Sequence, residues 1–529
     1  MTVPQDRIPA FDMPAATPAH TKARQRLKRF ARDEDGTLLI FGVYIFVLIL
    51  MVGGIGIDLM RFERDRSELQ YTLDRAVLAA ADLEQTLEPE DVVRDYFNKA
   101  GLGSNLRAVS LSQGLGYRTV SATADAEVRT QFMHMTGLDT MTAPAKGTAE
   151  ERVSSVEISL VLDVSGSMSR NNRLVNLKTS AKEFVDTLLG GMTNASSISI
   201  IPYATQVNAG EPLLSKFNVS NEHGYSHCVN FIPEQFKKTD IKVTDDLERT
   251  AHFDPFTYSE GSIDLPVCPV RAGTAILPLS GNREQLHAHI DSMTAGGNTS
   301  IDLGMKWGAA MLDPSLRGPV ALLAAEGEVD ARFIGRPLDY DNGETLKIIV
   351  LISDGENTDQ YFLNPSLRTG DSDVWYNEAA DRYSVYHSQG NPHFYWPHRG
   401  KWYDHPYGDE EPGDAVRLPH TELFNRASLR WIASYLYSYT NSASGRWLSA
   451  AYEKRESSAK NQFTKHICGA TKDKGVIVYT IGLEAPKVGL RTLKDCASSD
   501  SHFFEVEGLD IADAFSAIAT SIRKLRLTQ

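Results

Sequence analysis

The segment 163–167, Asp-Val-Ser-Gly-Ser, constrains this chain most, because it directly follows the apolar run 156–162. Such a run predicts a buried strand, so one carboxylate and two hydroxyls stand at the carboxyl end of that strand. Oxygen ligands of this kind suit a hard divalent cation. Given ordinary residue frequencies, the motif alone arises by chance in roughly one chain of this length in ten. It therefore needs support from elsewhere in the sequence.

Two later segments supply this support. Residues 346–355 form a second apolar run that ends in Asp354-Gly355, and residues 296–304 predict a loop that opens a helix after Thr299. A simpler interpretation exists for each loop alone, since the serines of the first can cap the following helix and Asp354-Gly355 can be only a turn. It does not explain why the three loops occur in this order. The candidate metal ligands are Asp163, Ser165, Ser167, Thr299 and Asp354.

These three loops resemble the metal-ion-dependent adhesion site of von Willebrand factor A domains. The resemblance implies that the two serines, and in some states Thr299, contact Mg²⁺ directly, and that the aspartates act partly through bound water. Mn²⁺ or Ca²⁺ are the alternative ions. Because Mg²⁺ takes six oxygen ligands, a site rich in neutral hydroxyls leaves one position for water or for the carboxylate of another protein. The resemblance implies a binding protein for an acidic side chain, and not an enzyme.

The rest of the carboxy-terminal part, residues 151–529, predicts an α/β fold. Apolar residues recur at helical spacing over 174–189, and strands are expected at 197–203, 274–279, 475–481 and 502–506. Alternating strands and helices are typical of a doubly wound, mostly parallel sheet of the Rossmann-like kind, whose ligands bind beyond the carboxyl ends of the strands. Further helices are expected at 283–293, after Thr299, near 490–496 and at 511–525.

Three long insertions interrupt this pattern, at about 208–272, 316–344 and 359–421. The first joins two strands that we expect to form a hairpin, and the first and third should emerge at the metal end of the sheet. The third is rich in aromatic residues, which are either binding anchors or a small core of the insertion itself. The second should emerge at the opposite end. The aromatic and histidine residues of the third insertion are Tyr361, Phe362, Trp375, Tyr376, Tyr383, Tyr386, His393, Phe394, Tyr395, Trp396, Trp402, Tyr403 and Tyr407.

The amino-terminal part contains a membrane-spanning candidate. Residues 38–57 carry no charge and are long enough to cross a bilayer as a helix. By the positive-inside rule, the basic tail 1–36 stays in the cytoplasm and everything after the helix 37–58 lies outside. A cleaved signal peptide is the alternative, but no small-x-small cleavage site follows the run. The basic residues of the tail are Lys22, Arg24, Arg26, Lys28, Arg29 and Arg32.

The four cysteines all follow this helix, and an even number outside the cytoplasm favours disulfides. Three pairings are possible. We favour Cys228 with Cys268, which would close the first insertion, and Cys468 with Cys496, which would join the two helices that flank the strand at 475–481. Four buried thiols are less expected outside the cytoplasm, and a Cys₄ zinc site lacks the usual C-x₂-C pair.

Residues 59–150 predict a small α+β region, with helices at 61–87 and 91–99 and strands near 118–128 and 143–155. A membrane helix that continues into a soluble helix and a small sheet is the layout of a pilin-like subunit.

A second resemblance is more specific. Gly36 before the apolar run, Gly56-Ile57-Asp58 at its end and the segment 69–81 resemble the TadE/TadG-like amino-terminal region of tight-adherence (Flp) pilus-assembly proteins. With a von Willebrand factor A domain behind it, the chain resembles TadG-like members. Related pseudopilins carry a glutamate five residues after the processing glycine, where this chain has Phe41, so we expect the anchor to be retained.

The two resemblances together imply an assembly or adhesion factor in the inner membrane of a bacterium. Its main domain would be periplasmic or extracellular, and its partner a pilus or secretion-machine component. A structural, pseudopilin-like subunit in which the metal only stabilises the fold is the alternative. The formal charge of −14 argues against nucleic acid as a partner. A hydrolase with Asp163 as nucleophile is disfavoured, because Ser165 stands where such sites have a second acidic residue.

Overall fold

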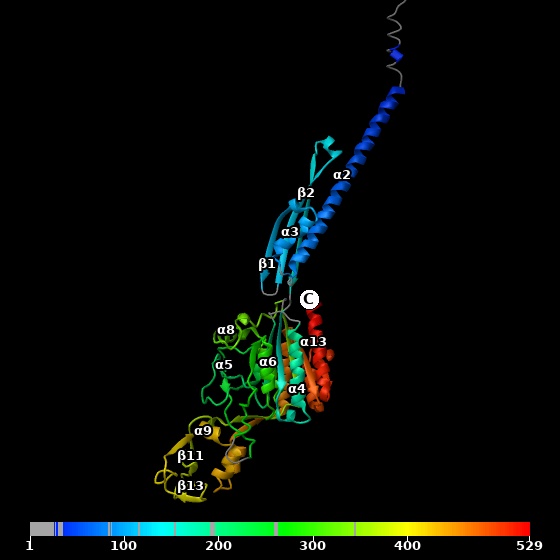
Figure 1. Cartoon of the computed structure of the whole chain (residues 1–529). Coiled ribbons are helices and arrows are strands. Elements are labelled where there is room, and N and C mark those ends of the chain that lie inside the picture. The colour runs from blue at the N-terminus through cyan, green and yellow to red at the C-terminus, as the bar shows by residue number, and fades with distance from the viewer. Residues whose placement is uncertain are drawn as a thin grey trace, which may run out of the picture. The chain divides into compact units, whose positions relative to one another are not determined.

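A computed structural model of the chain describes residues 26, 28–29, 35–82, 85, 87–114, 117–152, 155–190, 196–258, 263–342 and 345–528 (Figure 1). Of the basic tail, Lys22, Arg24 and Arg32 lie outside these residues. The chain divides into two compact units, Met1–Glu151 and Arg152–Gln529. Each unit is described by itself.

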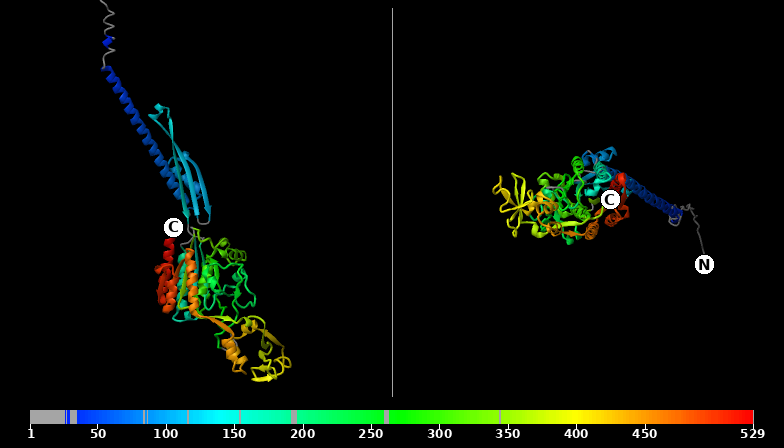
Figure 2. Two further views of the ribbon diagram at one scale, coloured as in Figure 1. Left: turned by 180° about the vertical axis from the view of Figure 1, so that it is seen from behind. Right: turned by 90° about the horizontal axis from the view of Figure 1, so that it is seen from below.

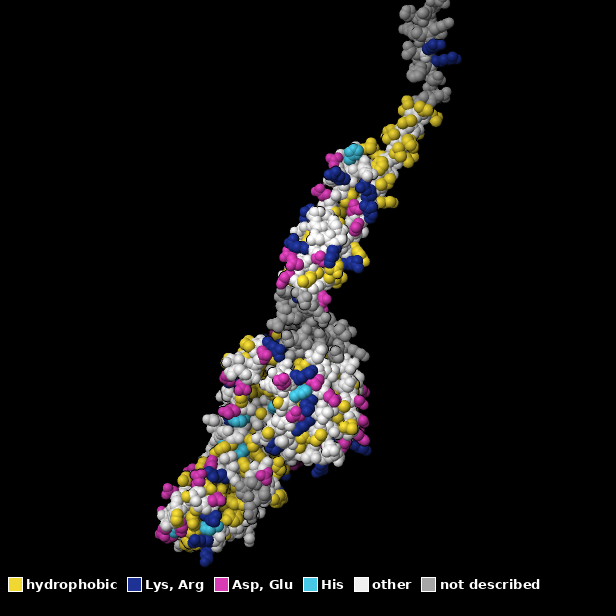
Figure 3. Space-filling model, viewed as in Figure 1, with side chains coloured by type: hydrophobic (Ala, Val, Ile, Leu, Met, Phe, Trp, Pro, Cys, Tyr) yellow, Lys and Arg dark blue, Asp and Glu magenta, His cyan; other side chains and the backbone are white. Residues whose placement is uncertain are grey.

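The first unit is built on one continuous helix, α2 (Asp35–Ala81). Among the described residues, it is the one helix long and apolar enough to cross a membrane. Large apolar side chains are exposed on all sides over most of its first half, and Figure 3 shows those on one side in yellow. In the second half, the buried residues Leu69, Leu73 and Val77 form a stripe at helical spacing. The helix stops at Ala81, before the expected end near residue 87, and α3 (Pro89–Lys99) follows.

The stripe on α2 packs against a three-stranded sheet of order β1-β2-β3. Alanines such as Ala122, Ala124 and Ala145 cover the inner face of the sheet, and their small side chains let the helix approach closely. The edge strand β1 was not expected from the sequence, because serine, glutamine and arginine interrupt its apolar pattern. The strands are β1 (Leu106–Gly114), β2 (Tyr117–Arg129) and β3 (Thr140–Arg152).

The second unit contains a six-stranded mixed sheet of order β18-β17-β9-β4-β5-β8. All neighbours in it are parallel except β5 and β8, which form the expected antiparallel pair. The two central strands, β4 and β9, are apolar and buried almost throughout. The strands are β4 (Ser155–Asp163), β5 (Ser197–Tyr203), β8 (Leu277–Ser280), β9 (Thr345–Ser353), β17 (Ile477–Leu483) and β18 (Phe503–Val506).

Helices cover both faces of this sheet, and each face has its own apolar cluster. On one face, α4 (Arg173–Leu189), α6 (Arg283–Ser292) and α13 (Ile511–Thr528) bury side chains such as Phe184 and Phe515, whose rings are 5.1 Å apart. On the other lie α7 (Ile301–Ala310), α8 (Arg317–Ala325), α11 (Ser457–Asp473) and α12 (Lys487–Cys496).

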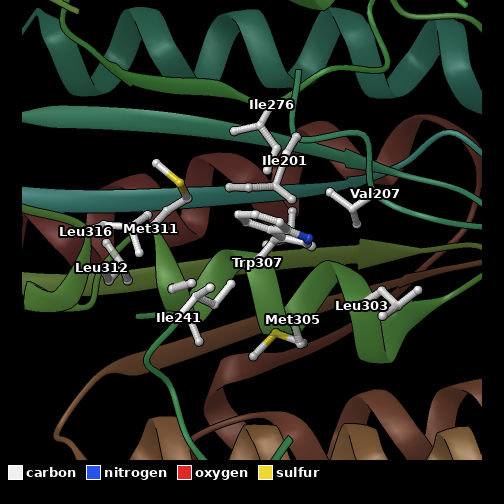
Figure 4. Close-up of a cluster of buried hydrophobic side chains, with 14 of the residues drawn as sticks. Ile201, Val207, Ile241, Ile276, Leu303, Met305, Trp307, Met311, Leu312 and Leu316 are labelled. Carbon is white, nitrogen blue, oxygen red and sulfur yellow. The ribbon is translucent and has the colours of Figure 1, made fainter. Parts of the chain in front are cut away.

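Helix α7 is the centre of the second face, because all ten of its residues are buried. Trp307 of α7 lies between Ile201 of β5 and Ile241 from the first insertion (Figure 4). Position 308 has no room for a side chain, since a Cβ at Gly308 would lie 2.5 Å from Val161 of β4. The helix is therefore held directly against the central strands.

The segment after β9 folds around aromatic side chains. It forms a five-stranded sheet of order β14-β13-β12-β11-β15, and it extends beyond residue 421, because β10 pairs with β16. Trp396 is fully buried and stacks on Tyr403 at 3.5 Å, while Trp375 is half-buried. At least part of the aromatic set is thus core. The elements are β10 (Gln360–Leu363), β11 (Asp371–Asn377), β12 (Arg382–Tyr386), β13 (Phe394–Trp396), β14 (Lys401–Tyr403), β15 (Ala415–Pro419), α9 (His420–Arg426), α10 (Leu429–Trp431) and β16 (Tyr452–Arg455).

Both expected disulfides are present, Cys228–Cys268 and Cys468–Cys496. The first closes the insertion that also holds α5 (Glu211–Leu214), β6 (Val229–Asn230) and β7 (Glu248–Arg249). The second joins α11 to the end of α12, and both of its cysteines are buried. Each disulfide closes a loop of moderate length, so each restricts the unfolded chain.

We expect the pair of substitutions Cys228→Ala and Cys268→Ala to lower the free energy of unfolding by about 4 kcal/mol, because the disulfide spans 40 residues of chain. Urea unfolding of the full chain in detergent, followed by tryptophan fluorescence, measures the loss. Treatment of the parent protein with a reductant is the control, and it should lower the midpoint at least as far. A variant as stable as the parent would show that this loop is already constrained in the unfolded chain.

Candidate metal-binding site at the strand ends

The site is formed where β4 and β9 end side by side. The two strands are parallel, and their register places Leu162 beside Ile352, so that Asp163 and Ser353 leave the sheet at the same level. After Asp163, the chain enters a short 3₁₀ turn (Gly166–Ser169) and then α4. The second loop, which contains Thr299, leads into α7. These connections bring three loops to one edge of the sheet.

Hydrogen bonds join four of the five candidate ligands. Asp163 Oδ1 accepts the backbone N–H of Ser165 at 2.8 Å, and the Oγ atoms of Ser165 and Ser167 are 3.1 Å apart. Ser167 Oγ in turn donates to Asp354 Oδ1 at 2.7 Å. Residues almost two hundred positions apart are thus linked through one hydroxyl.

Thr299 belongs to the same group. A Cβ built on Gly355 would lie 3.6 Å from Thr299 Oγ1 and 3.9 Å from Ser167 Oγ, so both hydroxyls border the space next to Gly355. The backbone N–H of Gly166 also donates to the carbonyl of Gly297 at 2.9 Å, which ties the first loop to the second. All five candidate ligands therefore lie together.

The two carboxylates of the site repel each other. Asp163 is fully buried, and burial together with the nearby charge of Asp354 raises the pKa of its carboxyl to about 7. Arg173, at the start of α4, relieves part of this repulsion, because its Nη1 donates to Asp354 Oδ2 at 2.7 Å. Its Nη2 also pairs with Glu484 at 2.8 Å. The arginine therefore joins the site to the end of β17.

The donor set fits a hard cation. It offers three hydroxyls and two carboxylates whose mutual repulsion a dication would relieve, and oxygen is the ligand that Mg²⁺ and Ca²⁺ prefer. Ser165 and Ser167 would be the direct hydroxyl ligands by this chemistry. Over the described ranges, no three His, Cys, Asp or Glu side chains gather closely enough to hold a metal ion. A site here would depend on serine and threonine.

Three supporting residues were not expected from the sequence. Ser353 Oγ donates to Asp163 Oδ2 at 2.7 Å and so orients that carboxylate. Because Ser353 directly precedes the candidate ligand Asp354, the sequence alone could have indicated it as a site residue. Arg173 is recognisable only once α4 is placed. Lys460 of α11 lies more than 150 residues after Thr299 in the chain, and no local pattern connects the two.

Lys460 of α11 supports the second loop, which contains Thr299. The lysine is fully buried, and its Nζ donates to the carbonyl of Thr299 at 3.3 Å and to Ser300 Oγ at 2.5 Å. Its charge is matched by buried Asp302 of α7, 3.6 Å away. The amino-terminal end of α7, which directly follows Thr299 and Ser300, is thus fixed by an ion pair inside the protein.

Several solved structures are similar to parts of this chain. The von Willebrand factor domain of the type V pili tip protein Mfa5 from Porphyromonas gingivalis is 15% identical, with 70% of this chain and 96% of that chain covered and a TM-score of 0.31. The open form of the pilus adhesin SpaC from Lactobacillus rhamnosus GG is 15% identical over 80% of this chain and 33% of its own, with a TM-score of 0.28.

The PilB minor pilin from Streptococcus sanguinis is 13% identical over 79% of this chain and 78% of its own, also with a TM-score of 0.28. No curated protein matches this chain in sequence. The model of the Tad family, Flp pilus-assembly TadE/G-like proteins, matches residues 36–83. These residues include the apolar half of α2 and its buried stripe, so the amino-terminal helix of this chain carries the TadE/G-like region of Flp pilus-assembly proteins.

Proposed function

We propose that this chain is a membrane-anchored assembly or adhesion factor of a tight-adherence pilus, and that it binds an acidic side chain of a pilus or secretion-machine component through a metal ion. The TadE/G-like region and the membrane-spanning helix support the pilus association and the anchor. In this proposal the α/β unit is a von Willebrand factor A domain, and it lies outside the cytoplasm by the positive-inside rule. Its role is binding and not catalysis.

The observation that carries the proposal is the convergence of Ser165, Ser167 and Thr299 with two carboxylates at one edge of the sheet. Neutral hydroxyls neutralise little of the charge of a dication. When the ion is bound, it therefore supplies a Lewis-acidic position that a carboxylate from another protein can fill. Mg²⁺ is the proposed ion, with Mn²⁺ and Ca²⁺ as alternatives.

One observation favours the structural alternative. The network of Ser167, Asp354, Arg173 and Glu484 is continuous without an ion, because Arg173 supplies positive charge to Asp354. A subunit with such a network could use the site only to hold three loops together. The two functions predict different results when one candidate metal ligand is substituted. The binding function predicts a folded chain that loses its partner, and the structural function predicts an unstable chain.

Substitution Asp163→Ala tests this difference. We expect Mg²⁺ affinity, measured by calorimetry on the full chain in detergent, to fall at least tenfold, since even partners outside the ligand set cost 10–100-fold. Capture of partners from solubilised membranes should fall to the level seen with EDTA, while the circular dichroism spectrum and the unfolding midpoint stay close to those of the parent.

The matched control is Ser169→Ala. Ser169 stands in the same turn, is exposed, and its hydroxyl donates to the carbonyl of Gly166. The control substitution should leave metal binding and partner capture unchanged. Partner capture that resists both EDTA and Asp163→Ala would refute the metal-dependent function. An Asp163→Ala chain that no longer folds would instead favour the structural alternative.

A further inference from the structure

The hairpin between β2 and β3 is fastened to α2 by one carboxylate. Asp58 of α2 is buried, and its two oxygens accept the backbone N–H groups of Gln131, Phe132 and Met133 at 2.8–2.9 Å. Three donors on one carboxylate fix both the position and the orientation of the hairpin tip, which we define as residues 130–139. In Figures 1 and 2 the end of this hairpin lies beside α2.

A second contact lies one helical turn earlier. Gly54 is buried, and a Cβ at this position would lie 2.4 Å from the ring of Phe132. The ring therefore rests directly on the backbone of α2, where only glycine leaves room. The adjacent Val52 and Ile57 are 61% and 48% exposed. Gly54 and Asp58, at positions i and i+4, lie on the same face of the helix, and the tip covers that face. The other faces stay exposed.

The height of this contact along the helix is informative. Gly54 lies inside the apolar run 38–57, about 4.5 Å before its end at a rise of 1.5 Å per residue. A helix that is apolar and exposed on all sides needs an apolar solvent, and its length fits a bilayer core. With α2 across a membrane, the tip would stand where the bilayer core ends.

The tip itself is suited to this boundary. Met135 and Leu138 are 68% and 43% exposed, although both are apolar. The N–H groups of Met135, Gly137 and Leu138 donate to carbonyls within the tip, so these groups can leave water at little cost. The charged side chains here are Arg129, just before the tip, and Asp139, its last residue, and the tip also carries the exposed His134.

We propose that the hairpin tip is a second membrane contact, and that Met135 and Leu138 enter the headgroup–acyl boundary of the same bilayer that α2 spans. This inference depends on the membrane anchor but not on the metal site. Two attachment points, the helix and the tip, restrict the tilt and rotation of the first unit on the membrane. A single spanning helix would leave both free.

Spin labels test the proposal in the full chain, reconstituted in vesicles of phosphatidylcholine and phosphatidylglycerol. The native cysteines are paired, so a label reacts only at an introduced thiol. Met135→Cys and Leu138→Cys report on the tip, Val47→Cys on the exposed spanning helix, and Ser110→Cys on the exposed outer strand β1. Collision rates with oxygen, which concentrates in lipid, and with a water-soluble nickel complex are compared.

We expect the labels at 135 and 138 to collide with oxygen several-fold more, relative to nickel, than the label at 110, and so to approach the label at 47. Labels at 135 and 138 that match position 110 would overturn the proposal. Spin–spin broadening at 135 that disappears on dilution with unlabelled chain would also overturn it, because a second copy would then cover the tip.

Substitution Asp58→Asn provides a second measurement, since the amide has nearly the same shape but accepts hydrogen bonds more weakly than a carboxylate. The label at 135 should then become several-fold more accessible to nickel. Unchanged accessibility would exclude Asp58 as the tether. Because none of these readings depends on the candidate metal site, they should be the same in a chain that also carries Asp163→Ala, and failure here is distinct from failure of the metal-dependent function.

Discussion

Lowering the pH from 7 to 4 should destabilise the α/β unit by several kcal/mol through two buried histidines, His223 and His252. Burial lowers the pKa of each imidazole to about 4, and His223 lowers that of His252 further. Among the residues that the structure describes, neither nitrogen of His252 has a hydrogen-bond partner, and Nδ1 of His223 has none. Protonation would therefore add a second N–H and a charge to each ring where no described residue accepts it.

The direction follows from proton binding. In the unfolded chain these imidazoles titrate near 6.5, so between pH 6.5 and 4 the unfolded state binds more protons than the folded state. The contribution of these two imidazoles to the free energy of unfolding is fully present above about pH 6.5. It falls as the pH drops through this window, and below about pH 4 it falls no further. A shift of this size corresponds to roughly 3 kcal/mol at most for each imidazole.

Urea unfolding at pH 7, 5.5 and 4 measures this loss, and the difference between parent and His252→Gln isolates it from carboxylates that titrate in the same range. The difference should narrow toward low pH, because the variant lacks one proton-binding group. His466→Gln, on the exposed side of α11, is the control and should follow the parent. Parallel curves for parent and His252→Gln would show that this histidine is not the cause.

Replacing Lys460 with methionine should cost about 3–5 kcal/mol, because it leaves the buried carboxylate of Asp302 without its counter-charge. The same substitution removes one of three described donors to the carbonyl of Thr299, where the backbone N–H and the hydroxyl of Thr358 also donate, and it removes the donor to Ser300 Oγ. With the loop held less firmly, Mg²⁺ affinity should fall as well. Urea unfolding measures the first effect and calorimetry the second.

The matched control is Lys182→Met, which breaks a solvent-exposed ion pair with Asp291 and should cost less than about 1 kcal/mol. Adding Asp302→Leu to Lys460→Met should restore much of the stability, since apolar residues can replace a buried ion pair. If Lys460→Met were no more destabilising than Lys182→Met, Lys460 would not support the site.

The parts of the fold that could be predicted were those with a strong local signal. The long uncharged run, the apolar strands at β4 and β9, and the cysteine pairs all left clear patterns in the sequence. Strand β1 left none, because one side of an edge strand faces water and accepts polar residues. The carboxy-terminal end of the aromatic segment could not be predicted either, because it is set by the pairing of β10 with β16, which are some ninety residues apart in the chain.

At the site, a residue could be predicted when it stood directly at a strand end, as Asp163 and Asp354 do. Arg173 and Lys460 act through long side chains from helices whose packing is set by distant contacts. A sequence pattern with a period of a few residues carries no information about such contacts. The metal-binding role of the five candidate ligands remains a prediction, with the experiments above as its test.

The complete burial of α7 makes the strand-end chemistry dependent on events far inside the molecule. Thr299 sits at the start of a helix that rests on Val161 with no gap at Gly308, so a larger residue there must displace the whole helix and its leading loop. Under the proposed function, the affinity of the site for its ion can therefore change with residues about a dozen ångströms or more away, on the order of the length of such a helix. Partner binding would then vary through side chains that never touch the partner.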